Sequence, residues 1–577
     1  MAVGAPAAPG RTALNLTRFR LEPALILGVL CLAALSFLVV VPIGWLVLTS
    51  FQDSDTQALT LRNYLEAFSH RIYLEPIANS LRLAISVAAI ATIVGTALAW
   101  LVSRTDLPGR SILRPLILAA FVTPSFLGAE GWIFLAAPNS GWINKIWVAL
   151  FHSEHGPLNV FSMQGAIFVI ALYSIPYTFS FVSATLDMMP SELEDAATTL
   201  GSGIFRTMWS VTLPLALPAI LSGFLLSFLE ALELFGPPAF LLIPARQQVM
   251  TTQLYLFFSD YPPRVEVAAA YAMPLLLVTA SLLLVQRRII GRRRFTTVGG
   301  KGGVRRRMQL RTWRWPFFGL AFILPLLSVI LPYTAMLLVS LSKNWSAGPF
   351  APGNLTLYWY DWALNVNGTT REAIVHSLSY GAVAATLAVV VATAVAYMAV
   401  RKLFPGVQAF AFLAMAPFVL PGIVLAIGFF AAYTHPPLLL YGTAGILVAA
   451  YATRFLPIAF SNSSSILQGL TTDLENAART LGAGPLRSLW TITVPLLRRG
   501  VLTSWLLVFI PALKELSASV FLYTSHTQVI TTVIYDFSDA GNFEAVSTMG
   551  VLMMVITFVI VIVAYRLIGR EVIRSAA

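Results

Sequence analysis

One polar segment occurs twice in this sequence, and the duplication constrains how the whole chain can fold. The first copy, residues 191–215, reads SELEDAATTLGSGIFRTMWSVTLPL. The second copy, residues 472–496, reads TDLENAARTLGAGPLRSLWTITVPL and lies 281 residues later. Between Glu194 and Leu215 the copies are identical at 12 of 22 positions, without gaps. A repeat of this kind indicates that the chain consists of two related halves.

Each copy is predicted to form a short helix, a glycine break and a second helix. A hydroxyl residue followed three positions later by glutamate fits a capping box. Two alanines give a helix face with little bulk, and a glycine can adopt the left-handed backbone that ends a helix. A proline then marks the start of the next apolar segment. These residues are Ser191 and Thr472, Glu194 and Glu475, Ala196, Ala197, Ala477 and Ala478, Gly201 and Gly482, and Pro214 and Pro495.

For a single copy, a polar hairpin that merely joins two membrane helices would be an adequate interpretation. Two copies at equivalent places in two halves favour a docking function instead. The segments between them are apolar, since the chain is 58% hydrophobic and only 11% charged. This composition indicates a polytopic membrane protein, and we predict an all-α fold.

Twelve apolar segments are each near the length of about 20 residues that crosses the hydrocarbon core. They are predicted near 25–49, 78–102, 115–137, 161–184, 215–243, 266–286, 316–341, 376–400, 408–433, 440–462, 499–522 and 544–566.

The basic residues predict the orientation of these spans. With the N-terminus inside, 27 Lys and Arg fall on the cytoplasmic side and 8 on the other, while Arg454 and Lys514 lie within spans. Cytoplasmic loops of membrane proteins carry such an excess. We therefore predict that both termini and both repeated loops are cytoplasmic. The net charge of +12 is explained in the same way, without a nucleic-acid partner.

The two halves are also similar outside the repeated loop. Residues 79–104 align with 376–401, which pairs Arg104 with Arg401, and Gly131 aligns with Gly428. Six spans per half give both halves the same orientation, so the repeats are parallel. The predicted domains are a cytoplasmic tail at 1–24, a first half at 25–286, a basic cytoplasmic linker at 287–314 and a second half at 315–577. The first half carries about 16 extra residues on the outer side, which include His152, Glu154 and His155.

The repeated segment resembles the EAA loop of permeases in bacterial binding-protein-dependent ABC importers. The resemblance rests on Glu194-Asp195-Ala196-Ala197 and Glu475-Asn476-Ala477-Ala478, on the glycine four residues after the alanines, and on the final Pro-Leu. Both copies insert one residue between the acid and the alanines. The similarity extends over nearly the whole chain and implies a fused permease with both membrane halves of a type I importer. Segments 231–242 and 512–523 are similar to the iron(III), thiamine and phosphonate type.

The resemblance implies several partners. The two loops would be coupling helices, each seated on one of two cytoplasmic ATPase subunits that use the ATP. A periplasmic or lipoprotein solute-binding protein would deliver the solute, and the chain would lie in the bacterial inner membrane. Ferric iron is the first candidate solute that the resemblance implies, and hard oxygen ligands would suit it. Thiamine, a phosphonate and a polyamine remain open.

Charged residues inside spans are costly and therefore candidate functional groups. Glu230 and Glu233 are three residues apart in the fifth span, and Lys514 and Glu515 occupy the matching part of the eleventh. One hypothesis is that these four line the translocation path between the halves. The alternative is a structural network of ion pairs and hydrogen bonds that holds the halves together. Glu130 and Arg454 are interpreted as structural or as reaching toward the membrane surface.

No pattern in the sequence indicates an enzyme, a bound cofactor or a metal centre. His152, Glu154 and His155 are interpreted as a solvated loop or a contact for the binding protein. Gly-Gly-Lys-Gly-Gly at 299–303 is not a phosphate loop, because glycine follows the lysine and no strand precedes it. The lone Cys31 lies in the first span. The rival hypothesis is an ion-coupled secondary transporter that uses the intramembrane glutamates and needs no ATPase.

Overall fold

The computed structural model describes residues 23–190, 192–291, 308–471, 473–482, 491–492 and 494–568. Within these ranges the chain forms helices, and the only β-type pairings are three isolated bridges. Ten helices are long and apolar enough to cross a membrane, and two further pairs of shorter helices bring the number of spans to twelve if each pair counts as one. The all-α, polytopic prediction is confirmed.

The first half contains six spans. In chain order they are α1 (Pro23–Leu35) with η1 (Ser36–Val40) and α2 (Val41–Ser50), α4 (Arg71–Arg104), α5 (Arg110–Val122) with α6 (Ser125–Ala136), α8 (Met163–Met188), α11 (Leu213–Glu233) and α14 (Val265–Gly291). The short helices of this half are α3 (Arg62–Ser69), α7 (Trp142–Phe151), α9 (Glu192–Thr199), α10 (Ile204–Thr207), α12 (Gly236–Leu242) and α13 (Met250–Ser259).

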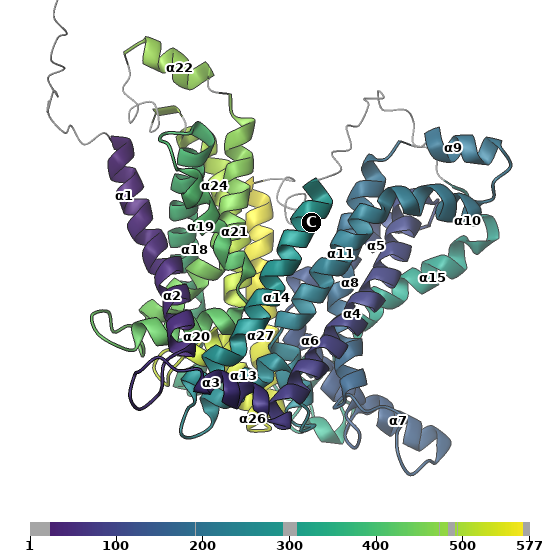
Figure 1. Ribbon diagram of the computed structural model, residues 1–577. Coiled ribbons are helices and arrows are strands. Elements are labelled where there is room, and N and C mark those ends of the chain that lie inside the picture. Colours follow the sequence, from purple (N-terminus) through teal and green to yellow (C-terminus); the bar gives the residue numbers. More distant parts are fainter. Residues whose placement is uncertain are drawn as a thin grey trace, which may run out of the picture.

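The second half repeats this order. Its spans are α15 (Arg314–Pro325) with η4 (Leu326–Ile330) and α16 (Leu331–Ser340), α18 (Gly368–Arg401), α19 (Gln408–Met415) with α20 (Gly422–Tyr433), α21 (Ala444–Gly469), α24 (Val494–Leu513) and α27 (Phe543–Ile568). Among its short helices are α22 (Asp473–Thr480), α25 (Ser519–Leu522) and α26 (Ile530–Asp539). Figure 1 shows α9 and α22 at the same end of the molecule, which we call the loop end.

Two of the twelve predicted spans are not straight helices. The third is bent by 99° between α5 and α6, and the ninth by 113° where α20 begins. The bends fall at Thr123–Pro124 and Leu420–Pro421, where the residue before each proline is extended. A proline disfavours helical backbone at the preceding residue, which accounts for both breaks. The uninterrupted spans predicted at 115–137 and 408–433 are corrected accordingly.

The fifth and eleventh spans are shorter than predicted. The segments predicted at 215–243 and 499–522 end as helices at Glu233 and Leu513, and each is followed by a separate short helix, α12 or α25. The charged residues that were placed within these spans therefore lie at or just beyond helix ends. Helix α14 continues to Gly291, and residues 292–307 of the basic linker lie outside the described ranges.

The first span of each half packs against the other half. A Cβ on Gly131 would lie 2.5 Å from the carbonyl oxygen of Pro332, and a Cβ on Gly428 would lie 2.7 Å from that of Pro42. These glycines are equivalent in the two repeats, and each permits a close helix crossing that a side chain would prevent. The halves are therefore intertwined through α2 and α16.

Short π-helices in these first spans provide further hydrogen bonds between the halves. A π-turn disturbs the regular helical bonding and leaves carbonyls to other donors. In η1, the Phe37 and Leu38 carbonyls accept hydrogen bonds from the Tyr433 hydroxyl (2.5 Å) and the Thr453 hydroxyl (3.0 Å). In η4, the Leu327 and Ser328 carbonyls accept from Trp132 Nε1 (3.2 Å) and the Tyr173 hydroxyl (2.8 Å). Every one of these donors lies in the opposite half.

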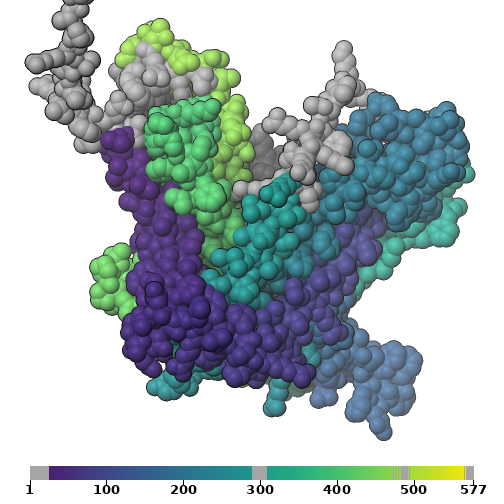
Figure 2. All heavy atoms as spheres, viewed as in Figure 1, coloured from purple at the N-terminus to yellow at the C-terminus, as the bar shows by residue number. Residues whose placement is uncertain are grey.

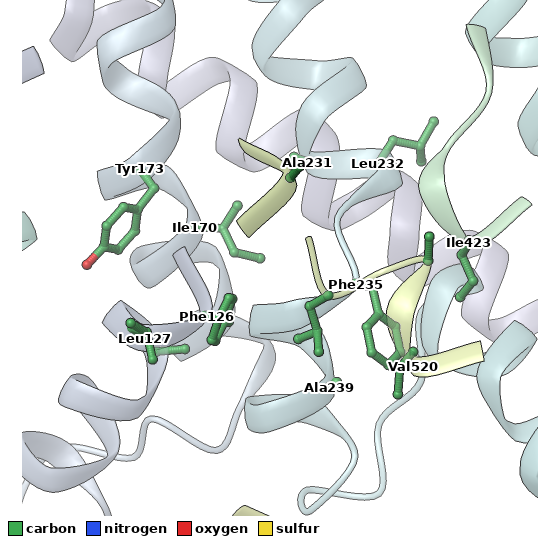
Figure 3. Close-up of a cluster of buried hydrophobic side chains, with 14 of the residues drawn as sticks. Phe126, Leu127, Ile170, Tyr173, Ala231, Leu232, Phe235, Ala239, Ile423 and Val520 are labelled. Carbon is green, nitrogen blue, oxygen red and sulfur yellow. The ribbon is translucent and has the colours of Figure 1, made fainter. Parts of the chain in front are cut away.

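A buried apolar cluster lies where the halves meet. Figure 3 shows Phe235 of the first half beside Val520 of the second, within a cluster that also includes Phe126, Ile170 and Ile423. The large aromatic side chains are fully or almost fully buried. Burial of such side chains stabilises a fold by about 1.5–3 kcal/mol each in water, and close packing takes over that role within lipid.

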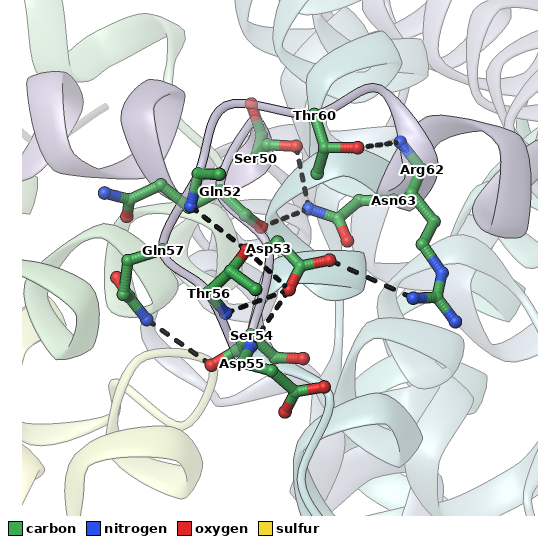
Figure 4. Close-up of polar contacts among 11 residues, drawn as sticks. Ser50, Gln52, Asp53, Ser54, Asp55, Thr56, Gln57, Thr60, Arg62 and Asn63 are labelled. Atoms are coloured by element: carbon green, nitrogen blue, oxygen red, sulfur yellow. Dashed lines mark hydrogen bonds and ion pairs between the residues drawn. The ribbon is translucent and has the colours of Figure 1, made fainter.

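The loop after the first span is also repeated. In the first half Asn63 Nδ2 donates to the carbonyls of Ser50 and Gln52 (Figure 4). The Ser50 and Tyr64 hydroxyls are 2.8 Å apart. In the second half the Ser340 and Tyr360 hydroxyls form the same contact at 2.7 Å. The parallel duplication inferred from the sequence therefore includes these loops, which lie at the end opposite the loop end.

Candidate functional site: the paired loops and the charged cavity

The first repeated loop folds as predicted, with α9, a glycine break and α10. Gly201 has φ +82°, and the equivalent Gly482 has φ +86°. Both are in the left-handed region that side chains rarely adopt, so glycine ends α9 and α22 as expected. Ala196 and Ala477 are exposed, while Ala197 and Ala478 are half-buried. Pro214 and Pro495 are the second residues of α11 and α24, at the start of the fifth and eleventh spans.

Part of the loop prediction lies outside the described residues. The predicted caps Ser191 and Thr472 are in this group, as is the side chain of Glu475. Glu194 is described, and its side chain points toward the membrane helices. Its carboxylate accepts a hydrogen bond of 2.6 Å from the Thr212 hydroxyl and lies 3.5 Å from Arg104 Nη1. Glu194 therefore fastens α9 to the membrane helices.

Arg104 forms a clamp that the sequence did not identify. The guanidinium lies at the end of α4, is almost fully buried, and donates from Nη2 to the Met189 carbonyl at 2.9 Å. The equivalent Arg401 donates to the Leu470 carbonyl at 3.4 Å. Met189 and Leu470 end the helices that lead into the two loops. The alignment of Arg104 with Arg401 was visible in the sequence, but the contact across the fold was not.

Each loop presents an exposed leucine at its tip. Leu200 is 88% exposed and Leu481 is 89% exposed, and they directly precede the two left-handed glycines. Leu193 and Leu474, also equivalent, are about half exposed. Apolar side chains presented twice, at matching places on firmly held loops, are typical of a surface that another protein covers. In the first loop, Glu194 anchors α9 to the membrane helices, and Leu200 exposes an apolar side chain at the tip.

The intramembrane charges come together around a cavity between the halves. The cavity has a volume of about 180 Å³, and its lining includes Tyr177, Glu230, Arg454, Lys514 and Glu515. Three of the four predicted path residues therefore line one space. Glu233, the last residue of α11, is half-buried and is not part of that lining.

The charges of the cavity are engaged with protein groups. Arg454 Nε lies 2.9 Å from a Glu515 carboxylate oxygen, and Lys514 Nζ donates to the Phe121 carbonyl at 2.6 Å. Glu230 accepts a hydrogen bond of 2.7 Å from Ser174. The Lys514 contact joins the second half to the bend of the first. Unpaired charges at this depth would be costly, so these contacts make the cluster tolerable.

Arg454 and Glu130 both contact polar side chains of the protein. Arg454 does not reach toward a membrane surface, because its half-buried side chain is paired with Glu515 and lies against Gly422, where a Cβ would be 2.3 Å from Nη1. The structural interpretation of Arg454 named no partner, because Glu515 is 61 residues away, in the break between α24 and α25. Glu130 is fully buried and accepts a hydrogen bond of 2.6 Å from Ser538, another contact between halves.

The loop between α6 and α8 of the first half forms a second cavity of about 310 Å³, lined in part by Lys145, Glu154 and His155. His152 adopts a left-handed backbone at the end of α7. Among the described residues, no group of three or more His, Cys, Asp or Glu side chains is arranged to hold a metal ion.

Comparison with known proteins identifies the family. The model for the "binding-protein-dependent transport system inner membrane component" matches residues 91–295 and again residues 388–574, which together are more than half of the chain. The chain belongs to this family. It contains the family domain twice, as a fused permease should.

Several relatives of this permease are characterised by name. The ferric transport system permease protein FbpB of Actinobacillus pleuropneumoniae is 24% identical over 92% of this chain and 76% of its own length. The putative FbpB 1 of Haemophilus influenzae is 25% identical, covering 88% and 79%. The putative 2-aminoethylphosphonate permease PhnV of Salmonella paratyphi A is 28% identical, covering 43% of this chain and 93% of its own.

A solved structure also aligns with part of the permease. The crystal structure of a bacterial ABC transporter that imports the acidic polysaccharide alginate has a TM-score of 0.40 and 15% sequence identity. The match covers 47% of this chain and 96% of the other.

Proposed function

We propose that this permease is the complete membrane portion of an ATP-driven importer. The observation that carries the proposal is the pair of equivalent loops at one end of two parallel halves, each anchored by a buried arginine and tipped by an exposed leucine. Two like-oriented loops fit two copies of one ATPase, seated on the cytoplasmic face. The chain itself binds no nucleotide, and ATP hydrolysis takes place on those partner subunits.

The proposal places the loop end in the cytoplasm, together with both termini of the chain. This orientation agrees with the excess of Lys and Arg on that side. A solute-binding protein, periplasmic or lipid-anchored, delivers the solute at the opposite end. The path passes through the cavity lined by Glu230, Lys514 and Glu515, which both halves form and which lies beside the helix end at Glu233.

Closure of the ATPases moves the two loops together and changes which end of the cavity is open. The contacts that must change are those between the halves, above all the bond from Lys514 to the Phe121 carbonyl. Because Phe121 lies at the bend between α5 and α6, movement of the loops and opening of the cavity are mechanically linked through that bend.

Ferric iron is the solute that we propose, on the strength of relatives named as ferric permeases that match nearly the whole chain. A phosphonate is the next candidate, because a relative named for a phosphonate matches 43% of the chain. Thiamine and polyamines remain open. The solute-binding protein makes most of this selection.

Reconstitution into liposomes tests the proposal against the secondary-transporter hypothesis. The importer requires the ATPase subunits, ATP and the binding protein for uptake of radioactive iron. A secondary transporter would take up solute as the isolated chain under an ion gradient and would lose that uptake in Glu230→Gln, while Gly201→Val would have no effect. Gradient-driven uptake by the chain alone would therefore overturn the proposal.

A further inference from the structure

Helix α7 lies at the outer end and contributes no residue to the cavity that we propose as the path. It lies between α6 and α8, where the first half has 26 residues and the second half has only the ten residues 434–443. In Figures 1 and 2, α7 projects beyond the rest of the bundle at the end opposite α9 and α22. The extra residues noted in the sequence therefore build a structured projection on one half alone.

The projection has an exposed apolar face. Ile146, Trp147, Leu150 and Phe151 are all exposed, with Leu150 at 68% and Phe151 at 62%. Their spacing places them on one side of the helix. The rings of Trp147 and Phe151 are in contact, with centroids 4.2 Å apart. We call this surface the α7 ridge.

The α7 ridge is held rigidly from its other side. The buried Asn144 donates to the carbonyls of Ala137 (2.9 Å) and Leu158 (2.8 Å) and accepts from the Leu158 N–H (3.0 Å). Trp142 Nε1 donates to the Trp345 carbonyl at 3.3 Å, and Lys145 donates to the carbonyl of Ser346. Both halves thus fix the position of α7, so its apolar face is presented without an ordering cost on binding.

We propose that the α7 ridge is the docking surface for the solute-binding protein, an inference that rests on the proposed function. Aromatic and aliphatic side chains at the centre with a polar rim are the composition of a protein interface. Here the rim is the cavity lined by Lys145, Glu154 and His155. A single receptor that binds two similar halves needs a feature that distinguishes them, and α7 occurs in one half only.

A lipid surface fits the ridge less well. Helices that lie in a membrane interface carry lysine and arginine on the polar face, where anionic lipids attract them. The one basic side chain of α7, Lys145, is engaged with the Ser346 carbonyl. The helix also points away from the bundle rather than along its side (Figure 2).

Photocrosslinking from the full chain in its native membrane tests the docking site. A benzoylphenylalanine replaces Leu150, and the matched control replaces Leu439, which is 63% exposed in the equivalent loop of the second half. We expect an adduct between position 150 and a protein that mass spectrometry identifies as a solute-binding protein. Adducts with lipid alone, or receptor adducts at position 439 and none at 150, would overturn the inference.

The captured receptor, purified, then permits a quantitative test. In the reconstituted complex, L150S/F151S should raise the receptor concentration for half-maximal ATPase stimulation about tenfold or more, because central aromatic and aliphatic side chains dominate such interfaces. The receptor-free ATPase rate should stay unchanged, which shows an intact complex. An unchanged half-maximal concentration would refute the docking site while the importer assignment stands, whereas a chain that binds no ATPase would refute both.

Discussion

At the scale of single residues, the repeated loops contain buried side chains that anchor them and exposed side chains that are free to contact a partner. Glu194 belongs to the first kind, since its carboxylate is almost fully buried between Arg104 and Thr212. The sequence revealed that Glu194 recurs as Glu475, but its inward direction depends on an arginine 90 residues earlier, on another helix. Sequence spacing alone carries no information about such a contact.

Arg104→Ala should loosen the first loop without removing the protein from the membrane. Hydrogen bonds to charged groups contribute about 1.5–3 kcal/mol each, and this change removes the partner of both Glu194 and the Met189 carbonyl. We expect faster hydrogen exchange of the α9 amides, measured by mass spectrometry. The control is Arg206→Ala in the same loop, where the side chain is exposed. Equal exchange rates in both variants would contradict the clamp.

Asp53 gives the loop between α2 and α3 a pH dependence. Its carboxylate accepts hydrogen bonds from the backbone N–H groups of Thr56 and Asp55, and these hold the pKa of Asp53 below its usual range. A lowered pKa stabilises the folded loop above the usual range, and the contribution is lost as the pH falls through the lowered value. We expect the loop to open to proteases below about pH 4, and Asp53→Asn should remove that dependence. A variant with the same acid response would disprove it.

At the scale of elements, composition and proline placement determined most of the helices. Eight of the twelve spans fall close to their predicted positions, because the length of an apolar segment is enough to locate them. The bends at Pro124 and Pro421 and the early ends at Glu233 and Leu513 were missed, since their apolar flanks resemble uninterrupted spans. These breaks are also where the charged cavity forms, so the sequence predicted the charges but not the space they surround.

The left-handed glycines offer a clean test of loop geometry. A Cβ on Gly201 or Gly482 would meet no atom within 4 Å, so Gly→Val there strains only the backbone, by about 1–2 kcal/mol. We expect reduced ATP-driven uptake with a normal amount of protein in the membrane. Gly203→Val is the matched control, because Gly203 is equally open and has φ −71°. Full uptake in both Gly201→Val and Gly482→Val would contradict the assignment of these loops as couplers.

At the scale of the whole molecule, the halves are joined by exchange of their first spans. Carbonyls of η1 and η4 accept side-chain hydrogen bonds from donors of the opposite half, and Gly131 and Gly428 allow the close crossings. The duplication was visible in the sequence. The packing of each first span against the opposite half was not, because a sequence repeat does not indicate which copy its first helix contacts. The intertwined halves can transmit movement of both loops to one cavity.

The assignment of the loops to ATPase subunits is best measured by affinity capture of the tagged chain from its native membrane, with mass spectrometry of the co-purifying proteins. We expect an ATPase with Walker motifs to accompany the chain. It should be lost in the double variant Leu200→Asp and Leu481→Asp, which alters two almost fully exposed side chains, and retained in Leu439→Asp. A chain that is captured alone, yet transports when reconstituted, would contradict the account.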